Sequence, residues 1–338
     1  MASAGAPSRL KSTALFLAPK ILQFVFVIWA TYTVTFLLIN ALPGDPVLAA
    51  LAAKGGDATT TDPEQLQALR ERYGLDGPLW QQYFVRLGGV LVGDFGISIS
   101  TGLPVLDLIG RALPNTAQVA ILALVLGILG AALVTFLAYL SRPRWLRNTL
   151  LQVPPLGVAI PAFLSGLVLI TVFSFGLGWL PSSGTRDPMS VVLPAITLAL
   201  PVGALFFQVF SSAVLEAMES PYVFTAVAKG LSSRTIFVRH VLRNSLLPSI
   251  TVIGLQIGYL AGGTAVVETV FSRDGIGRLT VDAVLARDVT VIQGVIVVVA
   301  IVYSLANLLV DLSYSFIDPR IRPALARPKT ARKAEVSA

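Results

Sequence analysis

The chain has no cysteine and a single histidine, His240, among its 338 residues. Disulfides, thiol catalysis and cysteine-ligated metal sites are therefore excluded, and one histidine cannot form a histidine cluster. Charge is also scarce, because only 13% of the residues are charged, about half the share that a soluble domain carries. Hydrophobic residues make up 55%, and the mean hydropathy is +0.78. Such a composition indicates a protein whose main solvent is lipid.

Motifs of self-powered transport are missing as well. The sequence has no G-x-x-x-x-G-K-[ST] loop to hold nucleotide phosphates, and no TVGYG-like segment for a potassium filter. Glu268 and Asp311 lie at the ends of apolar runs rather than near their middles, so ion coupling has no evident site. We therefore expect a protein that is not an enzyme, that binds no cofactor or metal, and that takes any transport energy from another subunit.

Six apolar runs are each long enough to cross a bilayer, which takes about 20 residues. They are Ile21–Leu42, Thr116–Tyr139, Leu150–Gly176, Val191–Val214, Leu246–Val267 and Thr290–Val310. The pattern predicts an all-α membrane protein with six transmembrane helices. The third run contains Pro154, Pro155 and Pro161, and the fourth contains Pro194 and Pro201. These prolines predict kinks, which either shape the bundle or let these two spans open a cavity alternately to each side.

Basic loops alternate with loops that are not basic. The segment 43–115 carries eight acidic residues against five basic ones, whereas four other segments are rich in Lys and Arg. The basic side chains of those four segments are Arg9, Lys11 and Lys20; Arg142, Arg144 and Arg147; Lys229, Arg234, Arg239 and Arg243; and Arg320, Arg322, Arg327, Lys329, Arg332 and Lys333. Because Lys and Arg gather on the cytoplasmic side, both termini are predicted to be cytoplasmic. The same rule explains the net charge of +7 without a nucleic-acid partner.

The runs also divide the chain into parts. We expect a cytoplasmic N-terminus at 1–20, a first transmembrane helix at 21–42, an external subdomain at 43–115, a five-helix core at 116–315 with a cytoplasmic loop at 216–245, and a cytoplasmic tail at 316–338 whose end is disordered. The first run has an apolar stretch longer than the roughly 7–15 residues of a signal peptide, so we expect it to be retained as an anchor.

The external segment predicts helices of its own. Asp62 and Pro63 form a typical helix start, and Gly74 is a typical helix end. The stretch Trp80–Val92 has spaced aromatic and aliphatic residues, and an amphipathic helix at the membrane interface is expected there. Such a subdomain either caps the bundle or meets an external partner.

The polar stretch Glu216–Arg243 lies between two apolar runs. Ser220 and Pro221 predict the start of a short helix, Gly230 its end, and Ser232 and Ser233 the cap of a second helix that runs to Arg243. A partner surface could approach the backbone closely at the small side chain of Ala226. The stretch predicts either a docking helix or an ordinary amphipathic loop.

Small residues in the fifth run predict close helix packing. Gly254 and Gly258 form a small-xxx-small pair, which fits a homodimer seam, a heterodimer seam or packing within the chain. Gln256 points to another side of that helix, where it serves a pore, a second interface or a hydrogen bond inside the bundle.

An ordered set of motifs resembles the permeases of bacterial ABC importers, and most closely their dipeptide/oligopeptide/nickel group. The set runs from about residue 20 to residue 322 and includes an "EAA"-type loop. Its elements are Pro43-Gly44-Asp45-Pro46, Tyr73-Gly74-Leu75-Asp76, Gly93-Asp94-Phe95-Gly96, Tyr222 with Ala226-x-Ala228-Lys229-Gly230, Leu242-Arg243-Asn244-Ser245-Leu246-Leu247-Pro248, Glu268-Thr269-Val270-Phe271, Gly275-Ile276-Gly277-Arg278 and Asp318-Pro319-Arg320.

The resemblance implies a fold, a place in the cell and partners. The fold would be that of type I ABC-importer permeases in a bacterial inner membrane, multi-pass in the lipid bilayer. The partners would be a homologous permease subunit, two ATPase subunits that hold ATP and Mg²⁺, and an extracytoplasmic substrate-binding protein. The cargo would be di- or oligopeptides.

The resemblance also implies site residues. The ATPase-coupling helix would be formed by Tyr222, Thr225, Ala226, Ala228, Lys229 and Gly230, with support from Arg243, Asn244 and Pro248. Gln256, Glu268 and Phe271 are candidates for a pore or an external gate. Phe224 and Val227 depart from the group, which often has arginines at these positions. A permease for another solute, such as nickel or a glycoside, and a non-transport scaffold remain as alternatives.

Overall fold

The computed structural model describes residues 9–41, 44–45, 47–48 and 63–317, and these residues form helices and connecting turns without a β-strand. The helices are α1 (Arg9–Ala41), α3 (Pro63–Arg72), α4 (Leu79–Leu91), α5 (Val105–Leu140), α6 (Arg144–Gln152), α7 (Leu156–Ala159), α8 (Ala162–Leu169), α9 (Val192–Met218), α10 (Pro221–Ala228), α11 (Ser233–Ile236), α12 (Leu242–Val270), α13 (Ile276–Leu285) and α14 (Val289–Ile317). Two π-helical segments, Ile170–Gly176 and Phe237–Val241, continue α8 and α11.

By length and composition, four helical segments of the described chain can cross a membrane alone. They are Ala18–Ala41, Val105–Leu140, Pro188–Met218 and Val289–Val310. Two further pairs pass the same test only together, because Arg144–Ala159 and Ala162–Gly176 meet at 106° and Pro248–Leu260 and Gly262–Val270 meet at 52°. The described residues thus contain four spans, or up to six if each bent pair counts as one.

The third apolar run is a chain of short helices and not one straight span. α6, α7 and α8 are separated at Pro154–Pro155 and at Pro161. Proline has no amide hydrogen to donate, and it drives the residue before it toward extended geometry. Ile160, just before Pro161, has φ −90° and ψ 122° accordingly. Pro201 lies inside α9, which nevertheless continues to Met218.

Several helices extend past the apolar runs on which the predicted boundaries were based. α1 begins at Arg9, inside the predicted N-terminal tail, and α5 begins at Val105, inside the predicted external segment. α5 carries Asp107 and Arg111 in its first two turns, so hydropathy alone places its start too late. The loop expected after Tyr139 contains the helix α6. The predicted disordered tail lies outside the described residues from 318 onward.

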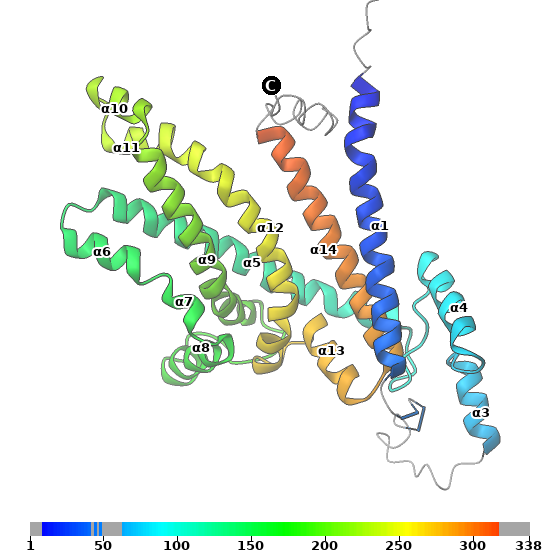
Figure 1. Ribbon diagram of the computed structural model, residues 1–338. Coiled ribbons are helices and arrows are strands. Elements are labelled where there is room, and N and C mark those ends of the chain that lie inside the picture. The colour runs from blue at the N-terminus through cyan, green and yellow to red at the C-terminus, as the bar shows by residue number, and fades with distance from the viewer. Residues whose placement is uncertain (1–8, 42–43, 46, 49–62, 318–338) are drawn as a thin grey trace, which may run out of the picture.

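The core is built around three long helices: α5 packs against α9, and α9 packs against α12. Phe206, Phe207 and Phe210 of α9 are fully buried between these elements. α1 and α14 pack side by side, and the start of α1 and the end of α14 lie at the same end of the molecule as α10 (Figure 1). α13 lies toward the opposite end, where α4 lies beside the end of α1 and α3 lies beyond α4 (Figure 1).

The glycine pair of α12 packs within the chain. A Cβ on Gly258 would lie 2.7 Å from Cε2 of Tyr303, and one on Gly254 would lie 3.3 Å from Val310, both on α14. Of the three kinds of helix packing that the spacing allowed, the described structure shows packing within the chain, of α12 against α14.

The two helices expected in segment 43–115 are present. α3 begins at Pro63, and the turn after it contains Gly74 at φ +60°, while the predicted cap Asp62 lies outside the described residues. α4 is amphipathic: Tyr83 packs on Tyr32 and Phe36 of α1, and the Tyr32 hydroxyl donates to the Tyr83 carbonyl at 3.1 Å. Phe84 and Val85 on the same helix are exposed, as expected for a helix at a membrane interface.

Asp45 joins α3 to the segment after α1, and this contact predicts a pH effect. Burial by itself would raise the pKa of Asp45, but hydrogen bonds from Arg70 and from the backbone of Val47 and Leu48 hold it below the ordinary value. A carboxyl with a lowered folded-state pKa stabilises the fold above its unfolded pKa of about 4, and this contribution is lost as pH falls through the folded pKa.

We therefore expect the hydrogen-exchange protection of the amides of residues 64–72, corrected for the intrinsic exchange rate at each pH, to fall below about pH 4 in the wild type. Asp45→Asn should show that loss of protection already at neutral pH. Equal protection of α3 in both proteins at neutral pH would contradict the tether.

Candidate functional site

The polar stretch between α9 and α12 folds into a compact helical hairpin at one end of the molecule (Figure 1). Pro221 occupies the first turn of α10, as predicted, although the Ser220 hydroxyl bonds to the carbonyl of Glu216 instead of capping the helix. Gly230 has φ +75°, which confirms it as the residue that reverses the chain after α10. Ser232 accepts a hydrogen bond from the amide of Thr235 and caps α11, also as predicted.

α10 has a buried face and an exposed face. Val223 and Ala226 pack with Phe237 and Val241, so Ala226 contacts the chain's own core. The prediction that a partner approaches the backbone at Ala226 was therefore wrong, since its small side chain lets α10 sit close to the next helix. Phe224 and Val227 are 66% and 58% exposed, and form the apolar part of the outer face. The remaining predicted residues, Thr225, Ala228, Lys229 and Gly230, are also exposed.

A side-chain hydrogen bond holds α10 on α12. Asn244 Nδ2 donates to the Tyr222 hydroxyl at 3.0 Å, which brings together two of the predicted site residues. Arg243 is exposed beside Asn244. The helix predicted to end at Arg243 does not end there, because the π segment Phe237–Val241 leads directly into α12, and Pro248 lies inside that helix. α11, the π segment and α12 therefore form one continuous helical stretch.

Glu268 lies at the far end of α12, fully buried in a cluster of hydrogen bonds. Thr116 of α5 donates to Oε1 at 2.6 Å, and the Arg278 amide donates to Oε2 at 3.1 Å. The same Thr116 hydroxyl accepts from the Ile276 amide at 2.7 Å. Glu268 therefore ties α5, α12 and the start of α13 together, and we call these four residues the Glu268 latch.

The three residues predicted for a pore or gate are buried within the chain. Gln256 donates to the carbonyl of Val202 on α9 at 3.0 Å, which is the buried hydrogen bond that the sequence left as one alternative. Phe271 packs with Ile170 and Leu193 in the core. None of the three, Glu268 included, lies on an open surface in this structure, so their role in a path between subunits stays a prediction that this conformation does not favour.

Two further charged residues make buried contacts that no local pattern predicts. Arg273 donates to the Gly184 carbonyl and to Ser190, 3.1 and 2.9 Å away, and burial lowers the pKa of this guanidinium. Asp288 accepts from Ser98 and Ser100 and also caps α14 through the Val291 amide. Their partners lie 83 to 190 positions away in the sequence, so no local spacing reveals them.

A metal-binding cluster of three or more His, Asp or Glu is absent from the part of the chain that the structure describes. The two places described above are an exposed, partly apolar face on α10 and a buried, hydrogen-bonded cluster around Glu268.

Residues 123–323 match the family model "Binding-protein-dependent transport system inner membrane component", and residues 14–120 match the model of its N-terminal part. The chain belongs to this family. It is the permease of an ABC importer and an inner membrane protein, and members of its family are membrane subunits rather than enzymes.

Curated relatives cover nearly the whole permease. It is 35% identical over 303 residues to the glutathione transport system permease protein GsiC of Escherichia coli (strain K12), covering 90% of this chain and 97% of the relative. The GsiC protein of Shigella dysenteriae serotype 1 (strain Sd197) has the same identity and coverage. A solved structure of the MetNI methionine ABC transporter, inward facing, matches with TM-score 0.54 at 18% identity, over 62% of this chain and 96% of that one. That likeness shows the fold alone.

Proposed function

We propose that this permease forms one half of the translocation path of an ATP-driven importer for di- or oligopeptides. A homologous permease subunit forms the other half. Two ATPase subunits bind ATP and Mg²⁺, and an extracytoplasmic binding protein delivers the cargo. The bundle end that carries α10 faces the cytoplasm, because the basic loops gather there. Six spans and two cytoplasmic termini satisfy this arrangement.

The observation that carries the proposal is the build of the α10 hairpin. Its outer face is exposed and apolar at Phe224 and Val227, and Gly230 closes it on one side. The Tyr222–Asn244 hydrogen bond links α10 to α12, and the π segment joins α11 to α12 without a loop. A docked ATPase that moves this surface can therefore transmit its conformational change to the transmembrane helices.

A peptide cargo is supported by relatives named as glutathione transport permeases, since glutathione is itself a small peptide. Nickel, a glycoside or another solute is the second candidate, and identification of the ligand on the binding protein decides between them. A non-transport scaffold is the third, and it predicts no ATPase stimulation by this chain.

Gly230→Asp tests the docking assignment. The position has open space around it, and Asp tolerates a positive φ better than most residues, so the hairpin should still fold. The added carboxylate would stand beside the apolar docking face, so we expect ATP-driven peptide uptake in proteoliposomes of the reconstituted importer to fall at least about tenfold, the equivalent of roughly 1.4 kcal/mol of lost docking.

Gly178→Asp is a matched control. Gly178 also has a positive φ, +65°, with nothing within contact distance, but it follows the π segment of α8 far from α10 in the chain. Uptake by Gly178→Asp should stay within about twofold of the wild type. Normal uptake by Gly230→Asp, with the complex assembled, would refute the docking role of α10.

A further inference from the structure

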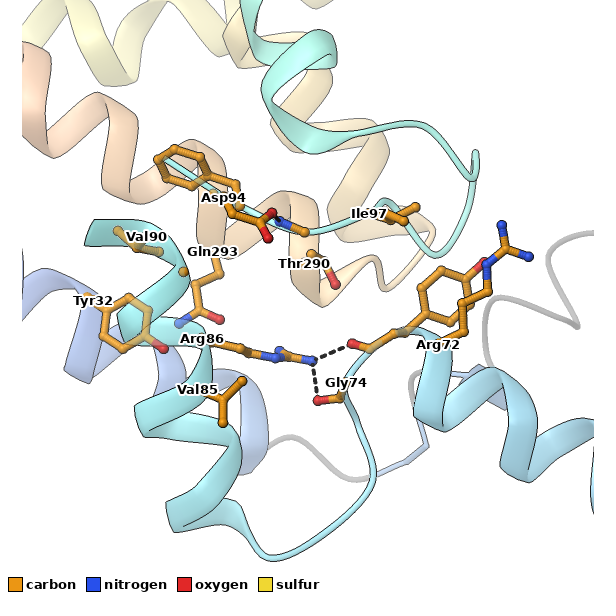
Figure 2. Close-up of a pocket in the computed structure, with 15 residues that line it drawn as sticks. Tyr32, Arg72, Gly74, Val85, Arg86, Val90, Asp94, Ile97, Thr290 and Gln293 are labelled. Carbon is orange, nitrogen blue, oxygen red and sulfur yellow. Dashed lines mark hydrogen bonds between the residues drawn. The ribbon is translucent and has the colours of Figure 1, made fainter. Parts of the chain in front are cut away.

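A cavity of about 350 Å³ lies between α4, the turn after α3, α1 and the start of α14. Figure 2 shows Arg86 reaching across it, with Tyr32 on one side and Thr290 and Gln293 on another. The proposed docking hairpin and the Glu268 latch contribute no residue to this cavity, so it is a separate feature of the fold.

Arg86 is fixed at this cavity by the backbone. Its Nη2 donates to the carbonyls of Tyr73 and Gly74, at 3.2 Å each. Among the described residues, the hydrogen bonds of Arg86 run through Nη2, so Nη1 and Nε remain as donors for a ligand. Burial lowers the pKa of this guanidinium, which stays charged, and a bound anion would relieve the unfavourable burial.

Two buried polar atoms on α14 lack a partner in the described part of the chain. They are Oγ1 of Thr290 and Nε2 of Gln293, on residues only 9% and 6% exposed. The Gln293 side chain also interacts with the Tyr32 hydroxyl, although its Nε2 meets no acceptor at ordinary hydrogen-bond distance and angle. An unmatched buried donor costs about 1–3 kcal/mol, so two of them beside one cavity indicate a missing acceptor.

The charge of the lining favours an anion. Arg72 and Arg86 line the cavity together with one carboxylate, Asp94. Oδ1 of Asp94 accepts from the Gly96 amide, which holds this carboxylate to its own turn. The lining thus has a net positive charge and an excess of donors over acceptors.

The surroundings favour a lipid as the source of that anion. Val85 and Val90 line the cavity, and Phe84 and Leu91 of α4 and Val92 just after it are exposed, the last two by 80% and 82%. A cationic recess beside an amphipathic helix at the membrane interface suits a headgroup with acyl chains. We propose that this cavity binds the phosphate headgroup of an anionic phospholipid, held by Arg86, Thr290 and Gln293, with its chains along α4.

Native mass spectrometry of the full-length chain tests this proposal. The protein in detergent is mixed with equal amounts of phosphatidylglycerol and phosphatidylcholine that carry the same acyl chains. We expect phosphatidylglycerol to bind preferentially to the wild type, and its apparent affinity to fall about tenfold in Arg86→Gln. Thr290→Val, which changes no charge, should weaken binding about threefold or more. Arg144→Gln, at an exposed arginine on α6, is the control and should bind like the wild type.

Each other outcome overturns the proposal. Equal binding of the two lipids would show that the protein does not distinguish an anionic headgroup from a zwitterionic one. Unchanged phosphatidylglycerol binding in both Arg86→Gln and Thr290→Val would place the lipid elsewhere. Glycerol 3-phosphate that binds without lipid as tightly as phosphatidylglycerol would make the ligand a free soluble anion. The readout does not depend on transport, so it stands apart from the importer proposal.

Discussion

Glu268→Ala should unfold at a markedly lower temperature than the wild type, with a loss of roughly 3 kcal/mol in stability. The Glu268 side chain is fully buried, and it accepts hydrogen bonds from the Thr116 hydroxyl and the Arg278 amide. Truncation leaves two partly buried donors without this acceptor and opens space between α5, α12 and α13. Thermal unfolding in detergent, followed by tryptophan fluorescence, measures the change.

Glu216→Ala is the matched control, because this carboxylate on α9 is exposed. Its stability should stay within about 0.5 kcal/mol of the wild type. Glu268→Gln should lie between the two, since the amide oxygen can serve one donor but its NH₂ group cannot accept from the other. A Glu268→Ala protein as stable as Glu216→Ala would mean that the latch contributes nothing to the fold.

Gly277→Ala should prevent the folded protein from accumulating. A Cβ at this position would overlap the backbone of Ala265 in α12, which cannot move aside as a flexible side chain could. Pushing α13 away from α12 would also strain the Glu268 latch, whose Arg278 amide is the next residue along the chain. Overpacking against backbone costs roughly 3 kcal/mol or more, enough to remove most of a marginal stability.

Gly110→Ala makes the same change in α5 where nothing lies within contact distance. It should be neutral or stabilising by up to about 1 kcal/mol, because alanine favours a helix over glycine. The yield of monodisperse protein from membranes compares the two variants directly. Equal yields would show that α13 can shift without cost.

The helical fold was largely predictable because lipid demands long apolar runs, and α9 and α14 begin within a residue of their predictions. The positions at which helices break were less predictable. Proline marked where the third run changes direction, at Pro154 and Pro161, but the same residue at 201 leaves α9 continuous. Whether a helix bends at proline depends on what packs around it, and a linear pattern does not contain that information.

In the candidate site, too, local features were predictable and contacts between distant residues were not. The start and end of α10 followed from Pro221 and Gly230, whose backbone preferences act locally. Which face of that helix is free did not follow, because Ala226 is buried by Phe237, eleven positions later in the chain. The contacts of Glu268 depend on Thr116, 152 positions away, so only the assembled fold brings them together.

The uninterrupted helical path from Ser233 through the π segment to Leu260 has a mechanical consequence. At 1.5 Å per residue, these residues form a rod of about 40 Å that ends at the 52° bend before Gly262. A sideways shift of about 4 Å at its outer tip would tilt such a rod by roughly 5°, if it turns about its inner end. The rod would then pivot at the bend before Gly262, while the Glu268 latch beyond the bend holds the end of α12 fixed against α5.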